Sequence, residues 1–179
     1  MLTANQRVGL KYYEDFLEKM PRAEATKIFE TVEAAAKKLF GENVIVNICG
    51  SYRRGRQTCG DVDILITRSD NRQVRGMLER LVVELEDQGF LKERLSLSAT
   101  SVDKAKEMYM GVCKVRDQKN ALARRIDIKV YPKEQYGYAI LYFTGSDYFN
   151  RSMRLFADKK GYTLSDHGMV PNSKASTSG

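Results

Sequence analysis

A Gly-Ser pair, two adjacent arginines and two aspartates one residue apart fall between residues 50 and 63 of this 179-residue chain. The segment around them, residues 49–67, reads CGSYRRGRQTCGDVDILIT. Carboxylate oxygens are the ligands that Mg²⁺ and Mn²⁺ prefer, and guanidinium forks match phosphate oxygens. These residue types together indicate a site in which divalent metal ions and arginines hold a phosphate-bearing substrate.

Residues 61–67 are expected to form a strand, in which alternate side chains share a face. Asp61 and Asp63 then lie on one face, about 7 Å apart. The opposite face carries the core residues Val62, Ile64 and Ile66. Neighbouring carboxylates repel each other, so the pair needs a cation. A single aspartate here would be an ordinary exposed strand residue, but the pair behind an Arg-rich loop favours a metal site.

A third carboxylate occurs in residues 124–130, RRIDIKV, where the same alternation places Asp127 on the polar face. If the two strands pair side by side, Asp127 meets Asp61 and Asp63. Three such carboxylates can hold two divalent ions about 3.5–4 Å apart, the arrangement used for in-line phosphoryl displacement. The sequence therefore predicts a two-metal site.

The loop before the aspartate pair has features of a phosphate-binding segment. A Gly-Ser turn brings backbone N–H groups and the Ser51 hydroxyl close to a ligand. Arg53 and Arg54 offer guanidinium groups, and Gly60 allows close backbone approach next to the first aspartate. The Walker A pattern is absent. The alternative interpretation is a charged surface loop.

Composition narrows the function class. The net charge of +7 and the pI near 9.3 favour an anionic partner, most commonly nucleic acid. Three cysteines without a CxxC pair and a single histidine, His167, argue against a Cys/His zinc site, a disulfide framework and a Ser-His-Asp triad. The sequence also lacks an apolar run of membrane-spanning length and a signal-peptide pattern. We therefore expect an intracellular protein with no membrane partner.

The elements that must position these residues follow from hydrophobic periodicity and turn signals. Helices are expected over residues 4–19, 25–39, 73–88, 135–143 and 147–159, and strands over 44–49, 61–67, 107–115 and 124–130. Residues 50–60 are expected to form a loop, or a loop with a short helical turn, and residues 94–106 to form a loop. This order predicts an α+β fold with a mixed β-sheet, helices packed on one face and short helical segments at its flanks.

Several motifs resemble the family X DNA polymerases, the group that contains polymerases beta and lambda. GSYRRGRQTCGDVDILIT and RRIDIKV resemble the palm of that family, and LYFTGSDYFNRSMR (residues 141–154) resembles its nucleotide-binding segment. NQRVGLKYYEDFLEKMPRAEA (residues 5–25) resembles the stretch leading from fingers to palm. The resemblance covers nearly all of residues 3–168 and does not separate the beta type from the lambda type.

The resemblance implies a nucleotidyltransferase-type palm and a role for each matching residue. Asp61 and Asp63 would bind both metals, and Asp127 would bind the catalytic metal and help to activate the primer 3′-OH. The triphosphate would be held by Ser51, Arg54 and Gly60. The sugar and base of the incoming nucleotide would be contacted by Tyr142, Phe143, Gly145, Asp147 and Asn150. The DNA would be contacted by Arg125, near the primer terminus, and by Arg154, at the templating base.

The residues of the 141–154 segment support this on independent grounds. An aromatic pair beside a Gly turn suits a sugar and base platform. Asn150 and Arg154 lie one helical turn apart and face the same side. An amphipathic core helix is the plainer interpretation of the segment.

The resemblance also implies an organisation and an activity. Residues 1–20 would end the fingers, 21–132 form the palm, 133–168 begin the thumb and 169–179 form a disordered tail. The expected activity is template-directed, Mg²⁺-dependent DNA synthesis in gap repair and base excision repair, with Mn²⁺ able to substitute. The expected substrates are gapped or primer-template DNA and dNTP, and the expected state is a nuclear monomer.

The family's lyase domain, its helix-hairpin-helix and most of its thumb have no counterpart in these residues. We therefore expect no lyase activity and only weak polymerase activity from this stretch alone. One alternative is a template-independent nucleotidyltransferase, disfavoured because Phe143 stands where such relatives tend to carry Trp, and because residues 116–123 leave no room for their extra loop. Another is a non-catalytic DNA-binding fragment.

Overall fold

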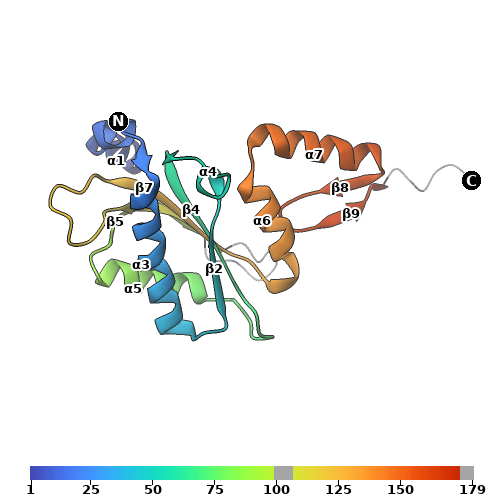
Figure 1. Cartoon of the computed structure of the whole chain (residues 1–179), viewed down its shortest axis with the longest axis horizontal. Coiled ribbons are helices and arrows are strands. Elements are labelled where there is room, and N and C mark those ends of the chain that lie inside the picture. Colours follow the sequence, from blue (N-terminus) through green and yellow to red (C-terminus); the bar gives the residue numbers. More distant parts are fainter. Residues whose placement is uncertain (99–106, 174–179) are drawn as a thin grey trace, which may run out of the picture.

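The computed structural model describes residues 1–98 and 107–173 of the chain. A five-stranded sheet with the order β2-β4-β7-β6-β5 forms its centre (Figure 1). The strands are β2 (Val44–Ile48), β4 (Asp61–Arg68), β5 (Leu91–Ser98), β6 (Glu107–Cys113) and β7 (Arg124–Val130). β4 and β7 run parallel, whereas the other neighbouring pairs run antiparallel. The sheet is therefore mixed, as the sequence predicted.

Helices α3 (Arg22–Phe40) and α5 (Met77–Asp87) cover one face of this sheet (Figure 1). Their apolar stripes, which include Val32 and Leu81, enter one buried cluster with the inward faces of the strands. The strand residues in it include Val62, Ile64, Ile66, Ile126, Ile128 and Val130. Each such fully buried side chain contributes about 1.5–3 kcal/mol. The α+β class is confirmed, with the two long helices α3 and α5 packed on one face.

The other face of the sheet meets a smaller helical layer. A 3₁₀ turn (Lys133–Gln135) leads into α6 (Tyr136–Thr144), which buries Ala139 in a second cluster with Cys49, Leu65 and Tyr131. Helix α7 (Asp147–Lys159) and the hairpin of β8 (Tyr162–Leu164) and β9 (Met169–Pro171) lie beyond α6 (Figure 1). The 141–154 segment lies in this layer, at the end of α6 and in most of α7.

The N-terminal segment contacts the edge strand β5 and pairs with the segment before β4. Helix α1 (Ala4–Lys11) and helix α2 (Tyr13–Leu17) precede β1 (Met20–Pro21), which pairs with β3 (Thr58–Cys59). Between β2 and β3 lies the short helix α4 (Gly50–Arg53). The predicted loop over residues 50–60 thus contains one helical turn and one short strand.

Three sequence predictions are wrong at the level of elements. A single helix over 4–19 is interrupted at Tyr12, which leaves helical geometry and packs with Val112 and Ala123. The loop predicted from residue 94 is instead the end of β5, which alternates in burial but carries the charged Glu93 on its less exposed side. The tail predicted over residues 169–179 contains β9. Residues 99–106 of the predicted loop and residues 174–179 of the predicted tail lie outside the described residues.

No helix within residues 1–98 and 107–173 combines the length and apolar character that crossing a membrane requires.

Tyr109 and Gly111 on β6 offer a test of the core. Tyr109 is fully buried, and a Cβ on Gly111 would overlap its ring and hydroxyl. Gly111→Ala is expected to lower the free energy of unfolding by about 1–3 kcal/mol, because the ring must leave its position. Urea unfolding followed by circular dichroism measures the change.

Gly137→Ala in α6 is the matched control, because no atom lies within 4 Å of a Cβ built there. This change should be neutral or stabilise the fold by up to about 1 kcal/mol. An unfolding midpoint that is the same for Gly111→Ala and for the unaltered chain would contradict the packing described.

Candidate active site

The three predicted carboxylates lie on two adjacent strands. In the parallel β4–β7 pair, Asp63 is directly opposite Asp127, and Asp61 is opposite Arg125. Because the intervening residues Val62 and Ile126 point into the core, all three carboxylates share the opposite face. The two strands thus pair side by side, which is the condition for Asp127 to lie beside Asp61 and Asp63.

The carboxylates influence one another's protonation. Desolvation is the main cause that raises the pKa of Asp61 above its ordinary value, and the Asp127 charge adds to it. Desolvation likewise raises the pKa of Asp63, supported by the charges of Asp127 and Asp61 and opposed by Lys129. Both shifts mean that the protein disfavours the ionised form. A cation placed among the three carboxylates would reverse this penalty.

Two basic side chains on β7 provide part of the positive charge that the three carboxylates need. Lys129 Nζ lies 3.0 Å from Asp63 Oδ1, with 7% of the Lys129 side chain and 17% of the Asp63 side chain exposed. Arg125 Nη2 lies 3.1 Å from Asp127 Oδ1. Lys129 Nζ also lies 3.8 Å from the centre of the Phe143 ring. One oxygen of each of these two carboxylates is therefore engaged by a cation of the chain itself.

The donor set suits a hard divalent ion in its chemistry, since it consists of carboxylate oxygens. In their present positions, however, no group of three or more His, Cys, Asp or Glu within the described residues could hold a metal ion. The binding of two divalent ions by Asp61, Asp63 and Asp127 stays a prediction; in the structure, Asp63 is paired with Lys129 and Asp127 with Arg125.

The loop before β4 lies beside these carboxylates. The Cys49 N–H donates to the Asp63 carbonyl oxygen at 2.7 Å, and Gly50, with a φ of 60°, begins α4. A Cβ on Gly50 would lie 3.8 Å from the Asp63 Cβ. Gly50 therefore contacts the face that carries the carboxylates, and Ser51 follows it on α4. Gly60 directly precedes β4, with no atom within 4 Å of a Cβ built on it.

Arg54 follows α4 and reaches the start of the next helical layer. Its Nη1 donates to the Thr144 carbonyl oxygen at 2.7 Å. A Cβ on Gly145 would lie 3.2 Å from the same Nη1, so glycine gives this guanidinium its room. Two predicted nucleotide-binding residues, Arg54 and Gly145, are thereby brought together.

The predicted sugar and base contacts gather where α6 passes into α7. The rings of Tyr142 and Phe143 are nearly perpendicular, with centres 5.0 Å apart. Asn150 Nδ2 donates to the Tyr142 carbonyl oxygen at 2.7 Å, and the Arg154 guanidinium lies 6.0 Å from the Tyr142 ring centre. Tyr142, Asn150 and Arg154 line a small cavity between α6, α7 and β8. Asp147 is exposed at the first position of α7.

Two features of the site were missed by sequence reasoning. The alternation in RRIDIKV places Lys129 on the same face as Asp127, but it does not indicate the pairing of Lys129 with Asp63. Arg22, which contacts α4, carried no sequence signal at all, because its partners are backbone carbonyl groups.

One larger cavity lies away from the site. It has a volume of about 810 Å³ and is lined by residues 70–75 and 132–134 together with Arg68, at the far end of β4 from Asp61. None of the predicted site residues lines it.

Comparison with known proteins agrees with this arrangement. The family model described as DNA polymerase beta palm matches residues 19–133, and the model described as DNA polymerase beta thumb matches residues 139–178. The chain belongs to the family X DNA polymerases. The five-stranded sheet with its three carboxylates lies within the residues that match the palm model. Helix α7 and the β8–β9 hairpin lie within the residues that match the thumb model.

Two curated relatives of this family X chain are named DNA polymerase lambda. The protein from Rattus norvegicus is 44% identical over 168 residues, which cover 94% of this chain and 29% of that protein. The protein from Arabidopsis thaliana is 38% identical over 180 residues, covering 98% of this chain and 33% of that protein. The chain thus spans about a third or less of the length of these relatives.

The raised pKa of Asp61 predicts a pH-dependent stability difference. The folded state binds the Asp61 proton more tightly than the unfolded state, where the pKa has its ordinary value of 3.8. Protonation of Asp61 therefore favours folding, and this stabilisation is lost as the pH rises. Without metal, Asp61→Asn is therefore expected to melt at a higher temperature than the unaltered chain at pH 7. The gain should shrink as the pH falls toward 3.8.

Thermal unfolding across this pH range, in buffer containing a chelator, measures the difference. Asp117→Asn, in the exposed loop before β7, is the control for the same chemical change and should bring no such gain. A melting temperature of Asp61→Asn below that of the unaltered chain at pH 7 would contradict the electrostatic description.

Proposed function

We propose that this chain is the catalytic palm of a template-directed DNA polymerase that fills gaps during DNA repair. The observation that supports it best is the register of β4 and β7, which sets Asp63 opposite Asp127 with Asp61 on the same face. Helix α4, which carries Ser51, begins beside that face at Gly50, and Arg54 follows it. Carboxylates next to a phosphate-binding segment suit phosphoryl transfer from dNTP to a primer 3′-OH.

In this proposal Asp61, Asp63 and Asp127 hold Mg²⁺, for which Mn²⁺ can substitute. The bound ions neutralise the charge that develops on the transferred phosphoryl group. For Asp63 Oδ1 and Asp127 Oδ1 to act as ligands they must leave Lys129 and Arg125, whereas the second oxygen of each carboxylate can bind an ion without this change. Asp127 then helps to activate the primer hydroxyl, while Ser51, Arg54 and Gly60 orient the triphosphate.

The proposed contacts to nucleotide and DNA use the residues around α6 and α7. Tyr142, Phe143 and Gly145 line the sugar, and Asp147 and Asn150 contact the base. Arg154, above the Tyr142 ring, contacts the templating base.

Arg125 is proposed to contact the primer terminus. Its Nε is buried and has no hydrogen-bond partner within the described residues. The side chain as a whole is 29% exposed, so its other guanidinium N–H groups can meet a primer phosphate. The repair role, a nuclear location and a monomeric state complete the proposal.

The metal-dependent step is tested by dNTP binding and by primer extension on a gapped duplex. Asp127→Asn is expected to reduce extension by at least about 10²-fold, because a metal ligand and the group beside the primer hydroxyl are lost together. A chelator should abolish both extension and metal-dependent dATP binding. Asp117→Asn should extend the primer at the rate of the unaltered chain.

We expect extension by the 179 residues themselves to be slow, because misplacement of the substrate by about 1 Å costs ~10²-fold in rate. Binding of dATP is therefore measured alongside. If the unaltered chain and Asp127→Asn both lack Mg²⁺-dependent dATP binding, the proposal is wrong and a non-catalytic DNA-binding role is favoured. Extension without a template would instead favour a template-independent transferase.

A further inference from the structure

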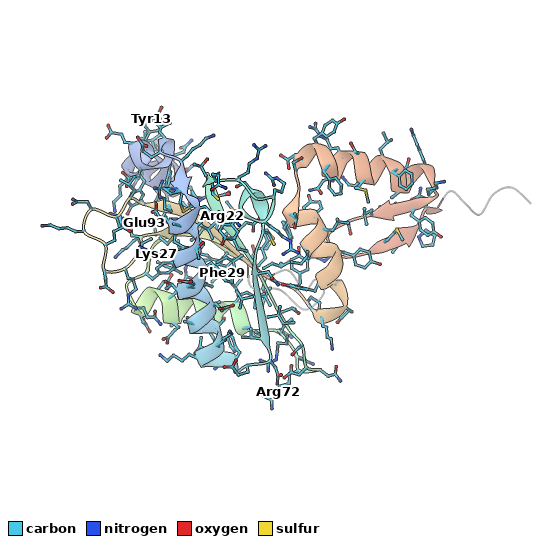
Figure 2. The ribbon with its side chains drawn as sticks, in the orientation of Figure 1. Tyr13, Arg22, Lys27, Phe29, Arg72 and Glu93 are labelled. Carbon is cyan, nitrogen blue, oxygen red and sulfur yellow. The ribbon has the colours of Figure 1, made fainter. Side chains whose placement is uncertain are left out.

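Arg22, at the first position of α3, contacts the end of α4 through its side chain (Figure 2). Its Nη1 donates to the Tyr52 carbonyl oxygen at 2.7 Å and to the Arg56 carbonyl oxygen at 3.1 Å. Its backbone N–H donates to the Gln57 carbonyl oxygen at 2.9 Å. One residue of the helical layer thus binds three carbonyl groups between α4 and β3.

The ring of Tyr52 completes this contact. The Arg22 guanidinium lies 3.7 Å from the centre of the Tyr52 ring, a close cation–π distance. The Tyr52 hydroxyl lies 2.9 Å from Thr26 Oγ1, one turn further along α3. Tyr52 is therefore held against α3 at both ends of its side chain, with its carbonyl group bound as well.

Helix α4 depends on such external contacts. It has four residues, and a helix of that length has little stability of its own. A cation at the carboxyl end of a helix satisfies its unpaired carbonyl groups and complements its dipole. On its other side, the Arg54 guanidinium reaches the Thr144 carbonyl oxygen.

We infer that Arg22 is a positioning residue for nucleotide binding: it fixes α4 so that Ser51 and Arg54 face the triphosphate. The inference rests on the proposed function, because the triphosphate is its ligand. Arg22 itself does not touch the nucleotide. The Arg22 side chain also holds Arg56 and its backbone N–H holds Gln57, which leads through β3 to Gly60 and Asp61, so one residue sets the phosphate-binding loop relative to the first carboxylate.

The contact requires arginine specifically. A guanidinium is planar and can stack on Tyr52 while its N–H groups donate to carbonyl oxygens in the same plane. A lysine keeps the charge but offers a compact ammonium group, which cannot stack and bind both carbonyl groups in this way. Arg22→Lys therefore separates the geometry from the charge.

Hydrogen exchange tests the positioning without reference to activity. The Gly55 and Arg56 amides donate to the Tyr52 and Ser51 carbonyl oxygens, so their exchange reports on the end of α4. In Arg22→Lys these amides should exchange about tenfold faster, while amides of β7 keep their protection. Lys27→Ala is the control, because Lys27 lies exposed on the same helix (Figure 2).

Binding of dATP with Mg²⁺ tests the consequence. The dissociation constant should rise about tenfold in Arg22→Lys, because only part of the population has α4 in place, and should stay unchanged in Lys27→Ala. If the unaltered chain binds dATP and Arg22→Lys matches it in affinity and exchange, the inference is wrong while the proposed function stands. If the unaltered chain does not bind dATP, the proposed function fails and the inference fails with it.

Discussion

Asp63 on β4 and Asp127 on β7 face each other across a parallel pair of strands, and the rest of the site is arranged around this register. In a strand, a slip of one residue moves every side chain to the other face. Ile64 and Ile128, which follow the two aspartates, point to the opposite face of the sheet and are fully buried under α3 and α5. The hydrophobic core therefore prevents the slip and, by doing so, sets the positions of the carboxylates.

The same register brings an electrostatic cost. Desolvation and mutual repulsion raise the pKa values of Asp61 and Asp63, so the fold carries charges that it disfavours. Lys129 and Arg125 relieve part of this cost, because they lie on the same face of β7 as Asp127. Their presence explains how three carboxylates can remain side by side, and it also means that a metal ion must compete with cations of the chain itself.

Much of this arrangement could be predicted from the sequence, and the exceptions have physical causes. The strand containing Asp127 was predicted with its observed bounds because apolar and polar residues alternate strictly along it. The strand β5 was not predicted, because the charged Glu93 stands between Leu91 and Leu95 on the less exposed side of the strand. The β8–β9 hairpin lies largely exposed, so it lacks a buried stripe. Contacts of Arg22 with carbonyl groups could not be predicted, because any residue offers a carbonyl group.

The central claim is that divalent ions take the places that Lys129 and Arg125 hold at Asp63 and Asp127. Anomalous diffraction from crystals of the chain grown with Mn²⁺ and dATP tests it most directly. The account predicts manganese bounded by Asp61, Asp63 and Asp127, with Lys129 Nζ moved out of hydrogen-bonding distance of Asp63. Manganese bound elsewhere, with Lys129 still paired to Asp63, would contradict it.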